Sequence, residues 1–335
     1  MKKLLFAIIT LGLILLAACG SSDASNNDSE ESTNNAGEEA GETYVVGATQ
    51  IVEHPSLDAA YEGFKEALAD AGLDVEYKFQ SAQNDQNNVK PISDGFVADD
   101  VDLIFANSTP SALGALQATN EIPIVFTSVT DAVDAKLVPS MDEAGENITG
   151  VVDLHPDAIG STVEFIAENF PEARVGVVYN AGEQNSVTQI DAIKEAAADT
   201  GLTIVERTVA NTAEVHQATT SLVEDIDVFY IFTDNTVVSA LDSVVSVANE
   251  QDIPLVVGEP DSLAKGGFAT FGIDYHTIGY RTGEIAAEIL ADGKSPSDFL
   301  VEYPPEIQLF INKAAAEEQG VEWNDAWDEE AQFIE

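Results

Sequence analysis

The chain has 335 residues, with 60 acidic against 13 basic side chains and a formal net charge of −47. Its 45% hydrophobic content is sufficient for buried cores, and its length favours about two domains. Binding to nucleic acid depends on Lys and Arg that neutralise phosphates. So acidic a chain is therefore a poor partner for nucleic acids and anionic lipid headgroups.

Residues 1–18 are typical of a signal peptide. Two lysines precede an apolar run from Leu4 to Ala18, which is short for a transmembrane helix. The sequence Leu-Ala-Ala-Cys, which ends at Cys19, resembles the bacterial lipobox; a plain secretory peptide with an incidental cysteine is the alternative. We expect cleavage before Cys19 and its lipidation, which would anchor the protein on the outer side of the cell membrane. Because this cysteine is the only one, no internal disulfide and no cysteine-based metal site are expected.

The segment that follows, residues 19–43, is rich in Ser, Asn, Gly, Ala and acids and lacks aromatic residues, which predicts a flexible tether. From residue 44 onward, short apolar runs alternate with amphipathic helical patterns. Strands are expected at 44–49, 73–79, 101–106, 122–127, 174–179, 202–209, 227–232, 254–257, 268–273 and 307–311. Alternation of this kind predicts an α/β protein with parallel sheets covered by helices.

A break near residues 147–156 divides this alternation into two doubly wound parallel-sheet lobes joined by a hinge. Lobe 1 is expected to span 44–152 and to be completed by about 275–300. Lobe 2 is expected to span 153–274 and to be completed by about 301–319. An acidic tail, 320–335, follows, and we expect its tryptophans to dock on the body in a short helix.

Polar side chains follow nearly every predicted strand. Ligands of open α/β sheets bind at the carboxyl ends of the strands, so these side chains are the candidate site. Any one of them is also an ordinary helix cap. The candidates are Gln50, Glu53, Ser108, Thr109, Thr127, Ser128 and Asp131 in lobe 1, and Asn180, Asn185, Ser186, Asp234, Asn235, Glu259 and Asp274 in lobe 2.

The chemistry of these residues suits a zwitterion. Hydroxyls and helix N-termini can hold a carboxylate, and the acids can pair with an ammonium group, for which Asp234 is the first choice and Glu53 the second. No arginine occurs at these strand ends, which disfavours a phosphate or sulfate ligand. The sequence carries no P-loop, dinucleotide fingerprint or nucleophile elbow, so we expect a binding protein with no cofactor and no metal.

Five blocks resemble the ABC-transporter substrate-binding lipoproteins of the tryptophan/tyrosine-binding type. They read GATQIVEHPSLD (47–58), IPIVFTSVTD (122–131), VYNAGEQNS (178–186), TDNTV (233–237) and GIDY (272–275). The resemblance implies a type I periplasmic-binding-protein fold, a monomer that closes on an aromatic amino acid, and delivery to a permease with a separate ATPase. By position it implies ligand contacts at Gln50, Glu53, Ser108, Thr109, Ser128, Asn180, Asn185, Asp234 and Asn235. The block 257–262 departs from the pattern, which leaves Glu259 and the ligand choice open.

Other functions remain open at this point. The same scaffold can bind an aliphatic amino acid or a nucleoside, or present its closed form to a membrane kinase as a ligand sensor. A two-lobed enzyme such as a racemase would need an acid/base pair across the cleft, and the only cysteine lies in the lipobox. A transcription repressor would need a DNA-binding helix-turn-helix where this chain has its signal segment.

Overall fold

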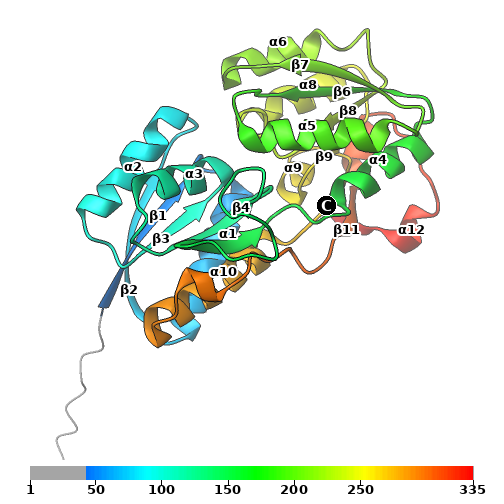
Figure 1. Cartoon of the computed structure of the whole chain (residues 1–335). Coiled ribbons are helices and arrows are strands. Elements are labelled where there is room, and N and C mark those ends of the chain that lie inside the picture. Colours follow the sequence, from blue (N-terminus) through cyan, green and yellow to red (C-terminus); the bar gives the residue numbers. More distant parts are fainter. Residues whose placement is uncertain (1–42, 335) are drawn as a thin grey trace, which may run out of the picture. The chain divides into compact units, whose positions relative to one another are not determined.

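The computed structural model describes residues 43–334, which form two β-sheets flanked by helices (Figure 1). The predicted signal peptide, Cys19 and the predicted tether lie outside the described residues, apart from Thr43, the first residue of the first strand. Within the described part of the chain, no helix has both the length and the apolar character needed to cross a membrane.

Lobe 1 is built on a five-stranded parallel sheet with the order β2-β1-β3-β4-β5. Its strands are β1 (Thr43–Gln50), β2 (Asp74–Ser81), β3 (Leu103–Asn107), β4 (Ile124–Val129) and β5 (Ile148–Val152). Its helices are α1 (Pro55–Asp70), α2 (Gln86–Ala98), α3 (Thr109–Ala118) and α10 (Tyr275–Asp292). The central strands β3, β4 and β5 are buried along their whole length, as expected for a parallel sheet covered on both faces.

Lobe 2 is built on a seven-stranded sheet with the order β12-β11-β10-β9-β8-β6-β7, parallel except between β10 and β11. Its strands are β6 (Arg174–Tyr179), β7 (Thr203–Thr208), β8 (Val228–Ile231), β9 (Leu255–Val257), β10 (Ala269–Gly272), β11 (Gln308–Asn312) and β12 (Gln332–Ile334). Its helices are α4 (Ala158–Asn169), α5 (Gln184–Ala197), α6 (Val215–Thr220), α7 (Asn235–Val238), α8 (Leu241–Glu250), α9 (Pro260–Ala264), α11 (Lys313–Glu318) and α12 (Trp327–Glu330). Two 3₁₀ turns, η1 (Thr212–Glu214) and η2 (Pro296–Asp298), complete the described elements.

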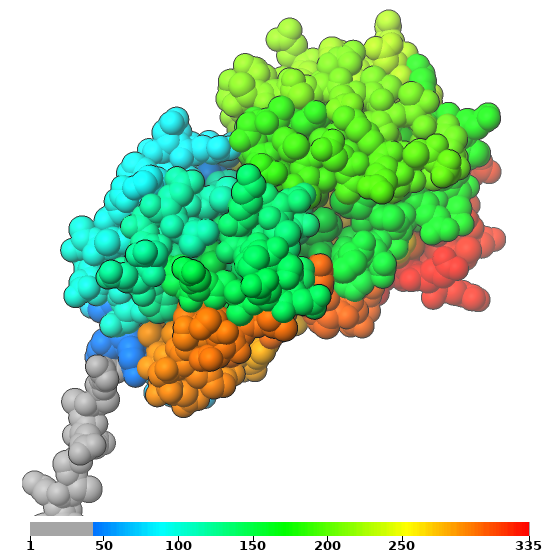
Figure 2. All heavy atoms as spheres, viewed as in Figure 1, coloured from blue at the N-terminus to red at the C-terminus, as the bar shows by residue number. Residues whose placement is uncertain are grey.

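The chain passes between the lobes three times: from β5 to α4, from β10 to α10, and between Glu302 and β11. Helix α10 therefore belongs to lobe 1 although it follows the strands of lobe 2. It packs on α1 through glycines, and a Cβ at Gly279 would lie 1.9 Å from the carbonyl oxygen of Ala60. In Figure 2 the orange atoms of α10 lie against the blue-green atoms of lobe 1.

The prediction of two doubly wound parallel-sheet lobes is confirmed. Several local features were not predicted. The expected break at 147–156 contains the buried strand β5, which is absent from the expected strands, and the segment between β8 and β9 forms two helices, α7 and α8, separated at Ser239 and Ala240. The C-terminal segment holds the short helix α12, whose Trp327 is buried, and also adds strand β12 to the edge of the second sheet.

Candidate functional site

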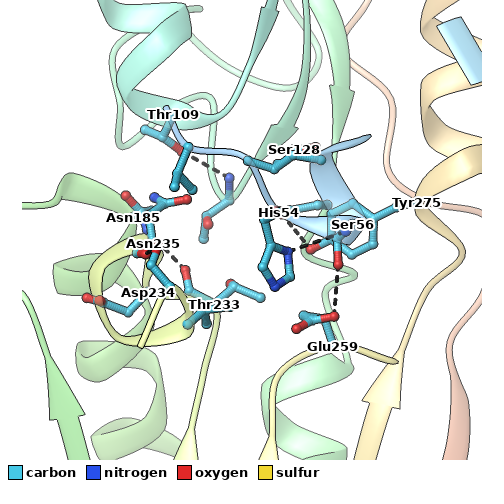
Figure 3. Close-up of a pocket in the computed structure, with 16 residues that line it drawn as sticks. His54, Ser56, Thr109, Ser128, Asn185, Thr233, Asp234, Asn235, Glu259 and Tyr275 are labelled. Carbon is cyan, nitrogen blue, oxygen red and sulfur yellow. Dashed lines mark hydrogen bonds between the residues drawn. The ribbon is translucent and has the colours of Figure 1, made fainter. Parts of the chain in front are cut away.

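A pocket lies where the strand ends of the two sheets face each other. Its walls come from loops after β1, β3, β4 and β5 of lobe 1 and after β6, β8, β9 and β10 of lobe 2 (Figure 3). The lining residues are Val52, His54, Ser56, Leu57, Thr109, Ser128, Thr130, Asp153, Asn185, Thr233, Asp234, Asn235, Val238, Ser239, Glu259 and Tyr275. The position of the pocket agrees with the rule that α/β sheets bind ligands at their carboxyl edges.

Six of the predicted residues line this pocket: Thr109, Ser128, Asn185, Asp234, Asn235 and Glu259. The other eight lie elsewhere: Gln50, Glu53, Ser108, Thr127, Asp131, Asn180, Ser186 and Asp274.

The residues outside the pocket mostly support its loops. Ser108 caps α3 and Asp274 caps α10 by accepting hydrogen bonds from the backbone N–H of Ser111 and Thr277. Asp131 accepts two backbone N–H groups of its own turn, Gln50 pairs with Asp58 and Asn107, and Thr127 is buried in β4. Glu53 is exposed. A residue after a strand is thus often a cap, as its chemistry alone allows.

Asp234, the first choice for an ammonium partner, has both carboxylate oxygens engaged by the protein. Its Oδ2 accepts hydrogen bonds from the Asn180 N–H and the Ser186 hydroxyl, each at 2.6 Å. Its Oδ1 accepts the Val237 N–H at 2.7 Å. Burial, together with the charge of nearby Glu183, raises the pKa of Asp234 to about 7. In Figure 3 its carboxylate points away from the His54 ring.

Glu183 is a buried carboxylate beside the start of α7 that is not among the predicted site residues. Its Oε1 accepts the N–H and hydroxyl of Thr236 at 3.1 and 2.7 Å, and its Oε2 accepts the side-chain amide of Asn235 at 2.6 Å. Carboxylates of this kind stabilise the N-terminus of a helix. With Asp234, Glu183 holds the loop between β8 and α7 in place.

Glu259 is similarly occupied. It caps α9 by accepting the N–H groups of Asp261 and Ser262 at 2.6 and 2.8 Å. It also accepts the Ser56 hydroxyl of lobe 1 at 2.9 Å, so it links the two lobes. Burial raises the pKa of Glu259.

The lobe 1 wall presents two hydrogen-bond donors that have no partner among residues 43–334: His54 Nε2 and the Ser128 hydroxyl. His54 Nδ1 accepts the Ser56 N–H at 3.3 Å as the cap of α1. Burial, aided by the charge of Lys265, lowers the pKa of His54 to about 4, so the ring is neutral and its proton is on Nε2. The sequence does not signal this role, because a histidine before a proline is typical of a loop.

Ser128 also has an unusual backbone. Its φ is 56°, in the left-handed region that disfavours residues with a side chain, and the β4–β5 register shifts between Phe126 and Val129. Strained residues of this kind concentrate at functional sites. The distortion occurs at a residue that lines the pocket with an unpartnered hydroxyl.

Asp153 and Tyr275 form a further unusual pair, at the hinge between the lobes. Asp153 follows β5 at the first crossing between the lobes, and Tyr275 begins α10 at the second. The Tyr275 hydroxyl donates to Asp153 Oδ2 at 3.0 Å, whereas Asp153 Oδ1 is shielded from solvent and has no partner within the described residues. Burial raises the pKa of Asp153 to about 6 and that of Tyr275 far above its usual value.

Comparison with known proteins agrees with this architecture. Residues 45–333 match the family model described as ABC transporter substrate binding protein. A tyrosine-binding protein of Clostridioides difficile is 41% identical over 319 residues, which cover 93% of this chain and 90% of that protein.

Two solved structures are also similar. The ABC domain of Streptococcus pneumonia in complex with L-Trp is 31% identical, with a TM-score of 0.83, over 88% of this chain and 100% of that one. The ligand-free, open structure of a substrate binding protein with adhesive properties from Clostridium difficile is 38% identical, with a TM-score of 0.65, over 87% of this chain and 99% of that one.

More distant neighbours share only the fold. A glucose-galactose binding protein from Geobacillus stearothermophilus, 16% identical, gives a TM-score of 0.63, so the fold is that of the type I periplasmic binding proteins. The family binds substrates and does not transform them. By the match over residues 45–333 and the 41% identity, the chain belongs to the ABC transporter substrate-binding proteins.

Proposed function

We propose that this protein is the extracytoplasmic binding component of an ABC importer, anchored through lipidated Cys19. It closes its two lobes on an aromatic amino acid, tyrosine or tryptophan, and delivers it to a permease. The family match supports transport, and the tyrosine-binding and tryptophan-bound relatives support the ligand class. The lipobox-like sequence before Cys19 supports the anchor.

The observation that carries the ligand assignment is the pair of unpartnered donors in lobe 1. His54 Nε2–H and the Ser128 hydroxyl are buried beside the pocket, and a buried donor without an acceptor costs about 1–3 kcal/mol. A ligand carboxylate satisfies both. No lysine or arginine lines the pocket, so these neutral donors suit a single carboxylate better than a phosphate.

Closure of the lobes is the mechanism that this fold supports. The structure agrees more closely with the tryptophan complex than with the ligand-free, open relative, by TM-scores of 0.83 and 0.65, although the identity to the open relative is higher. A ligand shifts the population of closed molecules only through contacts that the open form lacks. A zwitterion between the donors of lobe 1 and the groups of the hinge provides such contacts.

Calorimetry of the purified protein tests the ligand class. The protein is refolded to remove bound ligand and titrated with each of the twenty amino acids, in high salt because its net charge destabilises a compact state. We expect tight one-to-one binding of tyrosine, tryptophan or phenylalanine. Binding of aliphatic amino acids alone, or no binding by folded protein, would contradict the aromatic assignment.

The anchor and the transport role have separate tests. Cys19→Ser should move the protein from the membrane fraction to the soluble extracellular fraction, because the acyl attachment point is lost. Cells that lack the protein should lose uptake of the amino acid that calorimetry identifies. Normal uptake in such cells, together with loss of a transcriptional response to the ligand, would favour the sensor instead.

A further inference from the structure

We propose that Asp153 at the hinge binds the ligand's α-ammonium group, and that the apolar recess beside it receives the ligand's side chain. This inference rests on the proposed function, because it takes the ligand to be a zwitterionic amino acid. It differs from the sequence-based choice of Asp234.

The first argument compares the carboxylates that line the pocket. Asp234 and Glu259 have both oxygens hydrogen-bonded to the protein. Asp153 alone among them has an oxygen, Oδ1, that is shielded from solvent and unpartnered within the described residues. A buried carboxylate of this kind is costly unless a cation pairs with it.

The second argument concerns the source of that cation. The residues that line the pocket include no lysine and no arginine, and His54 is neutral because its pKa is about 4. The ionisable group in contact with Asp153 is Tyr275, which donates a hydrogen bond to it, and Tyr275 supplies no positive charge. The positive charge must therefore come with the ligand, and a primary ammonium group matches a single free carboxylate oxygen.

The third argument is the recess itself. A second pocket shares Asp153, Thr233 and Tyr275 with the main pocket, so Asp153 lies at the junction of the two. The recess is lined largely by apolar and aromatic side chains: Leu154, Ala158, Ile159, Tyr230, Phe271 and Ile273. An aromatic ring that enters such a site buries a large apolar area and prefers aromatic neighbours.

The two groups of contacts orient the ligand. The carboxylate faces His54 and Ser128 of lobe 1, the ammonium group faces Asp153 at the first crossing, and the ring enters the recess on the lobe 2 side. The Tyr275 hydroxyl holds Asp153 through Oδ2 and leaves Oδ1 for the ligand, so Tyr275 is a positioning residue.

The experiment is a binding cycle with two pairs of ligands and two matched protein variants. The ligands are L-tyrosine and its des-amino analogue, 3-(4-hydroxyphenyl)propanoate, together with L-tryptophan and indole-3-propanoate. The variants are Asp153→Asn and the control Asp274→Asn, which makes the same change in a cap of the neighbouring crossing that does not line the pocket. Thermal unfolding verifies that each variant is folded.

Wild-type protein should bind the amino acid at least about 100-fold more tightly than its des-amino analogue. Asp153→Asn should weaken binding of the amino acid by about 100-fold and leave the analogue nearly unchanged, whereas Asp274→Asn should change neither. The Tyr275→Phe substitution should weaken binding of the amino acid by about tenfold.

Three results would overturn the inference. The first is equal binding of amino acid and analogue by wild-type protein, a measurement that needs no variant. The second is an unchanged affinity in Asp153→Asn. The third is an equal loss for both ligands in that variant, which would indicate a structural role. If wild-type protein binds neither tyrosine nor tryptophan, the proposed ligand class fails, and that outcome is distinct from a failure of Asp153 alone.

Discussion

The two sides of the pocket use aspartate in opposite ways. On the lobe 2 side, Asp234 accepts hydrogen bonds from three donors of its own lobe, so both of its carboxylate oxygens already have partners. At the hinge, Asp153 accepts one hydrogen bond and keeps one shielded oxygen unpartnered within residues 43–334. The difference teaches that proximity to a pocket does not make a carboxylate a ligand contact. A carboxylate oxygen that has no hydrogen-bond partner in the protein is a better criterion for a ligand contact.

The largest expected effect is on the stability of the protein, and it tests whether Asp234 has a structural role. Asp234→Ala removes the acceptor of two backbone N–H groups and one hydroxyl in a buried loop. We expect it to lower the free energy of unfolding by about 3 kcal/mol, since each unpaired buried donor costs about 1–3 kcal/mol and loss of its repulsion with Glu183 offsets part of that. Urea denaturation measures this loss. A fully stable variant that no longer binds ligand would place Asp234 on the ligand instead.

The next largest effect concerns pH. The carboxyl of Asp153 has a raised pKa of about 6, because of its burial, and a bound ammonium group favours its ionised form. Affinity should therefore be full well above pH 6 and fall by up to about tenfold per pH unit as the pH drops below that value. Titrations between pH 7.5 and 5 measure the slope.

The control for the pH experiment is Asp153→Asn. Asp234, Glu259 and His54 line the same pocket and also have shifted pKa values, so they could produce a slope of their own. In the Asp153→Asn variant the decline centred near pH 6 should disappear. Persistence of that decline would assign it to one of the other groups.

The smallest effect is expected at Ser128. Ser128→Ala removes a buried hydroxyl that has no partner in the described protein, so stability should stay within about 0.5 kcal/mol of wild type. Affinity should fall about fivefold, because one hydrogen bond to the ligand carboxylate is worth about 1 kcal/mol. Calorimetry and thermal unfolding, with Thr127→Ala as the buried neighbour that does not line the pocket, separate the two effects. An equal loss of affinity in both variants would contradict a direct contact.

The sequence was sufficient for most of the strands, though not for β5 or β12, and for the edge of the sheets at which the pocket lies. It located Thr109, Ser128 and Asn185 because each follows or ends a strand with a clear apolar pattern. Asp153 is not among the predicted residues because no strand is predicted over Ile148–Val152, so the residue that follows this run is not recognised as a strand end. The run contains Ile, Thr and two Val residues, so its β-branched content was the available signal.

Other features could not be predicted from local patterns. Whether the carboxylate of Asp234 has hydrogen-bond donors depends on Asn180 and Ser186, which lie about fifty residues away in sequence. The neutral tautomer of His54 depends on a hydrogen bond from Ser56 and on burial by the folded chain. Such properties arise from tertiary contacts, and they cannot be predicted from secondary-structure propensity or from the spacing of residues in the sequence.

The placement of α10 in lobe 1 has a consequence for the order of folding. Its glycines allow backbone contact with α1, and a Cβ at Gly63 would lie 2.2 Å from the His276 carbonyl oxygen. Lobe 1 therefore cannot complete its core until every strand of lobe 2 from β6 to β10 has been synthesised. The face of α1 that α10 covers includes the buried residues Ala60 and Phe64. This face stays exposed until α10 is made, so a chain that emerges from its amino end is vulnerable to aggregation or proteolysis for most of its synthesis.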